Sequence, residues 1–170
     1  MRILVASAAA ALLLAAAPGP ARADDGESAL SVSLGYASFA IPEHEPPGGA
    51  FGLEYERGLS DVFWLRAAAA GGVYGADGGP SYATQGSLGI TYVVDVLKYV
   101  PYLHGGIGGV GIFGGELERE FHPVVELGAG LDILARRDLS WGPWLRLASF
   151  LDDSEFISGG VRLSWRWGFF

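Results

Sequence analysis

The chain closes with Val161-Arg162-Leu163-Ser164-Trp165-Arg166-Trp167-Gly168-Phe169-Phe170, and this stretch decides how the rest is interpreted. Alternate side chains of an extended strand point to opposite faces. One face would be apolar and aromatic, with Val161, Leu163, Trp165, Trp167 and Phe169. The other would carry Arg162, Ser164, Arg166 and Gly168. The apolar face of a last strand needs either a core completed by earlier residues or contact with lipid, and lipid contact is the simpler solution.

The same two-residue period runs through the chain, which has no long stretch with apolar residues at helical spacing. Eight strands are predicted, at 28–41, 50–59, 62–74, 82–94, 99–113, 123–134, 140–151 and from 156 onward. Turns near Asp61, Lys98 and Arg137 would share one end, and loops at 42–49, 75–80, 114–122 and 152–155 the other. An even number brings both termini to one side. We therefore predict an all-β fold, a closed eight-stranded antiparallel up-and-down transmembrane β-barrel.

The strand at 99–113 is so rich in glycine that its inward and outward faces stay open. Aromatic residues stand near both ends of the strands, as two membrane interfaces require. Four of them are out of phase with the apolar face and would point inward or follow bulges: Phe39, Tyr74, Phe150 and Phe156. The competing architecture is a soluble periplasmic β-sandwich. Bulky residues on one face and small ones on the other favour the narrow barrel.

Residues 1–23 are predicted to be a cleavable secretory signal peptide. Arg2 precedes an apolar run from Ile3 to Ala17, and Ala21-Arg22-Ala23 offers a small-x-small cleavage site. A retained membrane helix would need about 20 apolar residues, more than this run supplies. The mature chain, 24–170, would form one barrel domain.

Composition excludes several classes of function. With no cysteine, the chain has no disulfides, thiolate chemistry or cysteine-based zinc sites. The 19 acidic residues outnumber the 11 Lys and Arg, two of which, Arg2 and Arg22, would leave with the signal peptide. A net charge of −10 then makes nucleic acid an unsuitable partner.

Three stretches resemble the small outer-membrane β-barrel superfamily with OmpA-like, OmpX-like and OmpW-like members: 95–102, 126–132 and 161–169. The resemblance implies a monomer in a Gram-negative outer membrane, in contact with its lipid and lipopolysaccharide. It also implies assembly by the β-barrel assembly machinery, which recognises a C-terminal aromatic strand. That strand would be Val161, Leu163, Trp165, Trp167, Phe169 and Phe170. Phe170 departs from the usual pattern, because the alternation selects Phe169 as the final outward aromatic.

Charged residues at inward positions form the candidate functional set, four of each sign: Glu54, Glu56, Arg66, Glu126, Asp132, Arg146, Arg162 and Arg166. Charges inside a narrow lumen must be paired or hydrated. One hypothesis is a salt-bridged plug that closes the barrel, and the alternative is a set of solvated lumen residues with no special role. Depending on the turn, Arg66 would stand opposite Glu54 or Glu56.

The remaining motifs give weaker indications of function. Gly106-Ile107-Gly108-Gly109-Val110-Gly111 matches a dinucleotide-binding pattern, but no helix start follows it, so glycine here serves strand bending. His44 and His122 lie in or beside loops without the spacing of metal ligands. His104 could act as a base in a strand. Lipid A deacylases of this fold would place a serine two residues later, and this chain has Gly106.

Acidic loops offer a last candidate site. Two clusters, Glu116/Glu118/Glu120 and Asp152/Asp153/Glu155, could bind Ca²⁺ or simply be solvated. We predict no catalytic residue, cofactor or metal. A structural or surface-interaction role comes first, ahead of a narrow pore for small solutes and of a lipid A-modifying enzyme.

Overall fold

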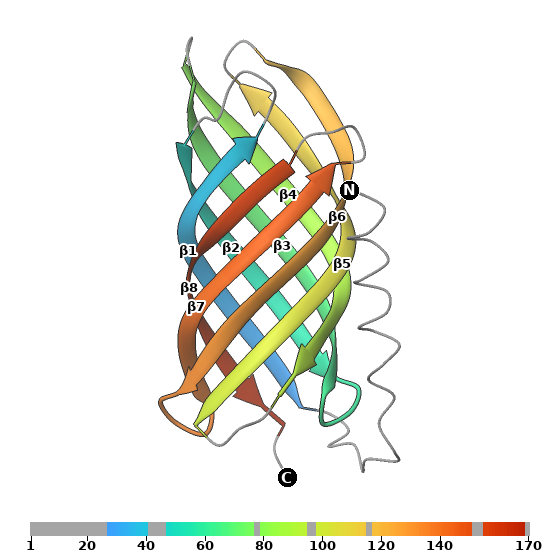
Figure 1. The fold of residues 1–170 in the computed structure, drawn as a ribbon, viewed down its shortest axis with the longest axis vertical. Coiled ribbons are helices and arrows are strands. Elements are labelled where there is room, and N and C mark those ends of the chain that lie inside the picture. Colours follow the sequence, from blue (N-terminus) through green and yellow to red (C-terminus); the bar gives the residue numbers. More distant parts are fainter. Residues whose placement is uncertain are drawn as a thin grey trace.

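Eight strands form one closed antiparallel barrel in the computed structural model, which describes residues 27–40, 47–76, 79–94, 98–114, 117–150 and 155–168. The strands are β1 (Ser28–Ala40), β2 (Pro47–Gly58), β3 (Phe63–Ala76), β4 (Gly79–Val93), β5 (Tyr99–Gly114), β6 (Leu117–Leu134), β7 (Leu139–Phe150) and β8 (Glu155–Trp167). Figure 1 shows them tilted around the barrel axis. The predicted all-β, closed eight-stranded architecture is confirmed. The predicted signal peptide, Phe169 and Phe170 lie outside the described residues.

Closure is made by the first and last strands. β1 pairs with β8 from Ser28↔Trp167 to Ala40↔Glu155, so the start of β1 and the end of β8 lie at the same end of the barrel. We call this the turn end, since the short connections 59–62 and 135–138 lie there, and the opposite end the loop end (Figure 1). Among the described residues, the structure contains no helix with the length and hydropathy of a membrane span.

Several predicted strand boundaries were wrong, and the largest differences arise because β2, β3, β4 and β6 continue further toward the loop end. β2 begins at Pro47, which pairs with Ser38, and Pro80 in β4 pairs with Gly75. Both prolines stand within the first two residues of a strand, where a missing N–H costs least. The predicted loop at 114–122 is also shorter, because β6 begins at Leu117.

Pro123 consequently lies inside β6 rather than at its start. It pairs with Gly109 of β5, and the described pairing of β6 with β7 begins at the next residue, with Val124↔Phe150.

The outward side chains are large and apolar along most of the wall, with exposed fractions of 46% for Leu163, 61% for Trp165 and 39% for Leu127. In β5, whose facing the glycines left open, Tyr102, His104 and Val110 point inward, while Leu103 and Ile107 are exposed. A register shift between Ile112 and Gly114 ends that alternation near the loop end.

Two apolar clusters close the interior. The turn-end cap consists of Ala29, Trp64, Val93, Val100 and Tyr102, with Leu134 packed against it. The loop-end cap consists of Ala37, Tyr74, Ala83, Val110, Val124, Ala148, Phe150 and Phe156. Three aromatics that were out of phase in the sequence therefore point inward, and the side chain of the fourth, Phe39, is outside the described residues.

Close approach of β1 and β8 requires glycine at the seam. A Cβ on Gly160 would overlap the carbonyl oxygen of Leu34 and lie 2.5 Å from Cα of Gly35. We expect Gly160→Val to lower the free energy of unfolding by about 1–3 kcal/mol, as overpacking does. Gly49→Val is the control, because nothing lies within 4 Å of its Cβ position. Heat-modifiable gel migration measures both; equal midpoints for the two variants would contradict the seam argument.

Candidate functional site

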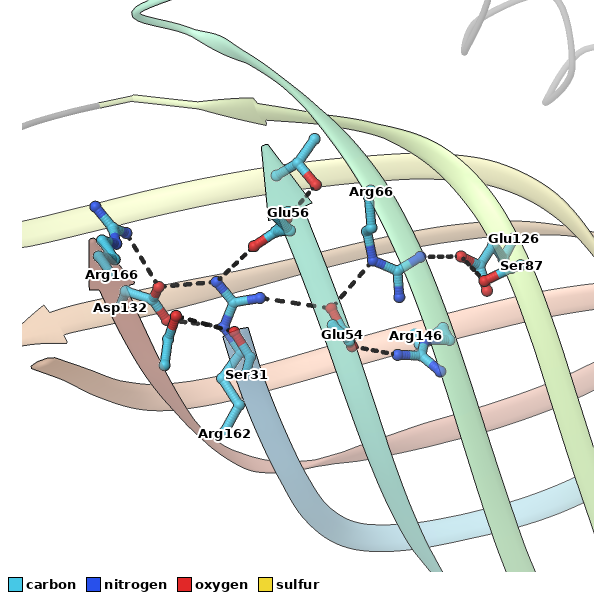
Figure 2. A network of polar contacts seen from close by, with 12 residues as sticks. Ser31, Glu54, Glu56, Arg66, Ser87, Glu126, Asp132, Arg146, Arg162 and Arg166 are labelled. Carbon is cyan, nitrogen blue, oxygen red and sulfur yellow. Dashed lines mark hydrogen bonds and ion pairs between the residues drawn. The ribbon is translucent and has the colours of Figure 1, made fainter. Parts of the chain in front are cut away.

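The barrel interior holds all eight charged side chains that the sequence placed there, six between the two caps and two, Asp132 and Arg166, level with the turn-end cap. They come from β2 (Glu54, Glu56), β3 (Arg66), β6 (Glu126, Asp132), β7 (Arg146) and β8 (Arg162, Arg166) (Figure 2). Strand alternation brings each of them inward. Arg66, Glu126 and Asp132 are fully buried, and the side chain of Arg166, the most accessible of those in ion pairs, is 14% exposed.

Glu54 and Arg66 form the loop-end half of the network. Arg66 Nε donates to Glu54 Oε2 at 3.0 Å, and its Nη1 donates to Glu126 Oε1. Arg146 Nη2 donates to the other oxygen of Glu54 at 2.6 Å. The backbone register sets Arg66 opposite Glu56, yet its guanidinium reaches Glu54. Both options left open by the sequence are thus used, one by the backbone and one by the side chain.

Glu126 also accepts hydrogen bonds from two neutral side chains of β4. Gln85 Nε2 lies 2.7 Å from Oε2, and Ser87 Oγ lies 2.9 Å from Oε1. The carboxylate is therefore compensated by three donors in an interior that is closed to bulk water, as a buried charge requires.

Arg162 connects the two halves. It forms a bidentate pair with Asp132, with 2.9 Å from Nε to Oδ1 and 2.8 Å from Nη2 to Oδ2. It also lies 3.6 Å from Glu54 and 3.7 Å from Glu56, and its Cζ stands 3.9 Å from the centroid of the Tyr102 ring. Arg166 adds a second cation to Asp132 at 3.3 Å. One guanidinium thus contacts three carboxylates and an aromatic face.

Neutral groups complete the network, and sequence reasoning did not include them in it. Thr91 Oγ1 lies 2.5 Å from Glu56 Oε1, and Ser31 donates to Ser164 at 2.9 Å. Trp144 and Trp64 stand beside Arg146 and Arg166, with 5.2 and 5.8 Å from Cζ to the ring centroid. The inward parity of these residues was the available signal, but parity does not say which neighbours a long arginine reaches.

Little space remains around these side chains. A cavity of about 20 Å³ lies beside the loop-end cap, next to Tyr74, Trp144 and Arg146. Another of about 10 Å³ lies beside the turn-end cap, next to Trp64, Tyr102 and Arg162. A water molecule needs roughly 10–15 Å³, so each of these two cavities holds about one molecule. Neither of them could hold a continuous column of water.

The other candidates do not join this site. His104 is 5% exposed and its ring stacks on Tyr102 with centroids 6.3 Å apart. The glycine motif at 106–111 lies within β5, without a helix after it. In the described part of the chain no cluster of His, Asp and Glu has the arrangement of a metal site. His44, Glu116, Asp152 and Asp153 lie outside the described residues, whereas Glu118 and Glu120 belong to β6 and Glu155 begins β8.

Several solved structures resemble this chain in fold, among them three barrels of bacterial surface proteins. The N-terminal β-barrel domain of Pseudomonas aeruginosa OprF matches with a TM-score of 0.63 and 17% identity, covering 84% of this chain and 98% of OprF. Ail, the attachment invasion locus protein of Yersinia pestis, matches with a TM-score of 0.62 and 15% identity over 84% and 99%. Neisserial surface protein A matches with a TM-score of 0.65 and 11% identity over 81% and 96%.

These likenesses concern the fold, because all three identities are below a fifth. No family model and no curated protein matches the sequence. The resemblance to small outer-membrane barrels that the sequence suggested is therefore confirmed at the level of architecture. Barrels of one architecture carry different activities, so the functional argument must come from the interior and from the wall.

Proposed function

We propose that the chain is a Gram-negative outer-membrane β-barrel that crosses the bilayer as a closed, non-conducting cylinder with a structural or surface-interaction role. The observation that carries the proposal is the inverted distribution of residue types. Eight charged side chains lie inside, while Leu, Val, Ile and aromatic side chains are exposed around the wall. Exposing such an apolar wall to water is unfavourable, whereas contact of the same wall with hydrocarbon is favourable.

The length and closure of the strands support this placement. The strands have 12 to 18 residues, and about 9–11 tilted residues suffice to cross a bilayer. Closure pairs the backbone groups of every strand with two neighbours, which hydrocarbon demands. The aromatic residues Trp165 and Trp167 of β8 would stand at the turn-end interface.

Biogenesis follows from the same placement. Residues 1–23 would direct export and be removed, and the exposed alternation Val161, Leu163, Trp165 and Trp167 would serve the β-barrel assembly machinery as a C-terminal signal. The protein would be a monomer surrounded by outer-membrane lipid and lipopolysaccharide.

A plugged interior favours a structural role over a pore. The cavities beside the two caps, of about 20 and 10 Å³, each hold about one water molecule, and the ion-pair network fills the cross-section between the caps. An enzymatic role has no support from His104, because it lies between the caps, out of reach of a lipid in the surrounding membrane. The proposal therefore assigns no catalytic residue.

Conductance and residue accessibility test this function together. The chain has no cysteine, so a thiol-specific label reacts only with a cysteine that has been introduced. We expect nitroxides attached at Leu127→Cys and Leu147→Cys to be reached by oxygen dissolved in lipid, whereas the thiol of Ser164→Cys, buried in the filled lumen, should not react with the label at all. Planar bilayers with the pure protein should show no steady current. Steady large currents would contradict the plug, and oxygen-inaccessible Leu127 and Leu147 would contradict the membrane placement.

A further inference from the structure

The outer wall carries a depression on β3, β4 and β5 where the outward residues are small. Its floor is formed by five residues: Ala67, Ala69, Thr84, Gly86 and Gly111. Two adjoining hollows of about 810 and 670 Å³ meet at Gly86. Both hollows are open along the wall rather than enclosed, so an occupant would lie against the barrel. We call this depression the outer basin.

Large side chains rim the outer basin. Leu88 and Ile107, 63% and 70% exposed, border it toward the turn end, and the stacked rings of Tyr82 and Phe113, with centroids 5.7 Å apart, border it toward the loop end. Phe121, 74% exposed, lies on its β6 side.

On either side of the outer basin, a glycine allows the aromatic ring of a neighbouring strand to lie against the wall. A Cβ on Gly71 would lie 2.5 Å from Cζ of Phe51, and a Cβ on Gly109 would overlap the ring of Phe121. By contrast, nothing lies within 4 Å of the Cβ position of Gly86. The side glycines are thus filled by neighbouring rings, and the central one faces open space.

The position of the outer basin along the barrel limits what can fill it. Gly86 is the middle residue of β4, with seven residues on either side, and it pairs with Ala69 and Gly109 in one row. In a membrane, the middle of a spanning strand faces the ends of acyl chains rather than headgroups. The floor offers no charge and a single hydroxyl, from Thr84.

We propose that the outer basin seats the terminal part of a lipid acyl chain, held longer than the chains that contact the rest of the wall. The inference rests on the proposed membrane placement and is continuous with it. An acyl chain can bend to fill a concave apolar surface. Each methylene that packs there stabilises the bound chain. On β7, by contrast, the outward residues Leu145 and Leu147 are bulky and 51% and 48% exposed.

A second copy of the barrel is a poorer occupant. A two-fold interface brings the same patch of both copies together. Two concave floors facing each other would leave a void at their centre, with the loss of packing that a void entails.

Photo-crosslinking tests the acyl-chain site. The barrel is placed in phosphatidylcholine nanodiscs with a trace of phosphatidylcholine that bears a diazirine near the terminal methyl of one chain. After irradiation, adducts are mapped by mass spectrometry. We expect adducts to concentrate on β3, β4 and β5 peptides. Gly86→Leu, which fills the hollow, should lower that labelling about tenfold, equivalent to about 1.4 kcal/mol.

Controls separate the site from general lipid contact. Ser149→Leu adds the same side chain on the outward face of β7, and Thr84→Val keeps the shape while removing the hydroxyl; neither should change the labelling. Ala69→Leu fills the outer basin from β3 and should repeat the loss if Gly86→Leu folds poorly. Even labelling around the barrel, or a loss with Ser149→Leu equal to that with Gly86→Leu, would overturn the site. Those results leave the membrane placement intact, whereas a barrel that does not enter nanodiscs would overturn both.

Discussion

Arg66→Met and Glu126→Gln are each expected to lower the free energy of unfolding by about 3–5 kcal/mol, the usual cost of breaking a buried ion pair. Both side chains are fully buried, and each variant leaves a charge of the opposite sign with fewer partners. Arg66 without Glu126 keeps only Glu54, at 3.0 Å. Urea unfolding in phospholipid vesicles, followed by tryptophan fluorescence, measures the difference.

The double variant Arg66→Met/Glu126→Gln makes this prediction sharper. It removes one charge of each sign, so the interior stays neutral, and replacing a buried pair is often neutral or stabilising. We expect it to recover most of the loss seen in either single variant. Arg57→Met is the matched control, because Arg57 is exposed at the turn end of β2. Single variants as stable as Arg57→Met, or losses that add in the double variant, would refute the proposed pairing.

Phe156→Ala is expected to lower the free energy of unfolding by about 3–5 kcal/mol, the usual cost of emptying a buried phenylalanine site. Phe156 is 8% exposed and its ring meets that of Tyr74 edge-on, with centroids 6.4 Å apart. Phe156→Leu keeps much of the volume and should lose far less. The same urea unfolding in vesicles measures both.

Conductance distinguishes the roles of cap and network. Phe156→Ala opens only the loop-end cap, and the ion pairs of Glu54, Arg66 and Arg146 remain below it. We expect no steady current from this variant in planar bilayers despite its lower stability. A current would mean that the aromatic cap, rather than the charged network, closes the lumen.

The sequence predicted the barrel well because the two-residue period is a direct consequence of strand geometry. Where bulky residues alternate with small or charged ones, as from Val161 to Trp167, one side must face inward whatever the partner strand is. Around Gly105 to Gly111 the period has too few side chains to be read. The early starts of β2 at Pro47 and of β6 at Leu117 were missed, because proline marks a probable end without fixing where pairing stops.

The sequence predicted which charged residues lie in the interior, but it did not predict which of them contact one another. Inward parity places Glu54, Arg66 and Glu126 in the lumen, but which carboxylate a guanidinium reaches depends on the stagger of strands that are far apart in sequence. Arg66 meets Glu126 across 60 residues, and Arg146 meets Glu54 across 92. The out-of-phase aromatics Tyr74, Phe150 and Phe156 were recognised as exceptions; their convergence into one cap could not be read from any single strand.

The sealed position of Arg162 sets the order in which the molecule must mature. With apolar residues across both mouths, a hydrated arginine or carboxylate cannot be admitted once β1 and β8 have joined. The pairing of Arg162 with Asp132, Glu54 and Glu56 must therefore happen while the wall is still open, and loss of water from these groups coincides with the final zippering of the cylinder. We therefore expect any barrel that is still open between β1 and β8 to have these charged groups hydrated.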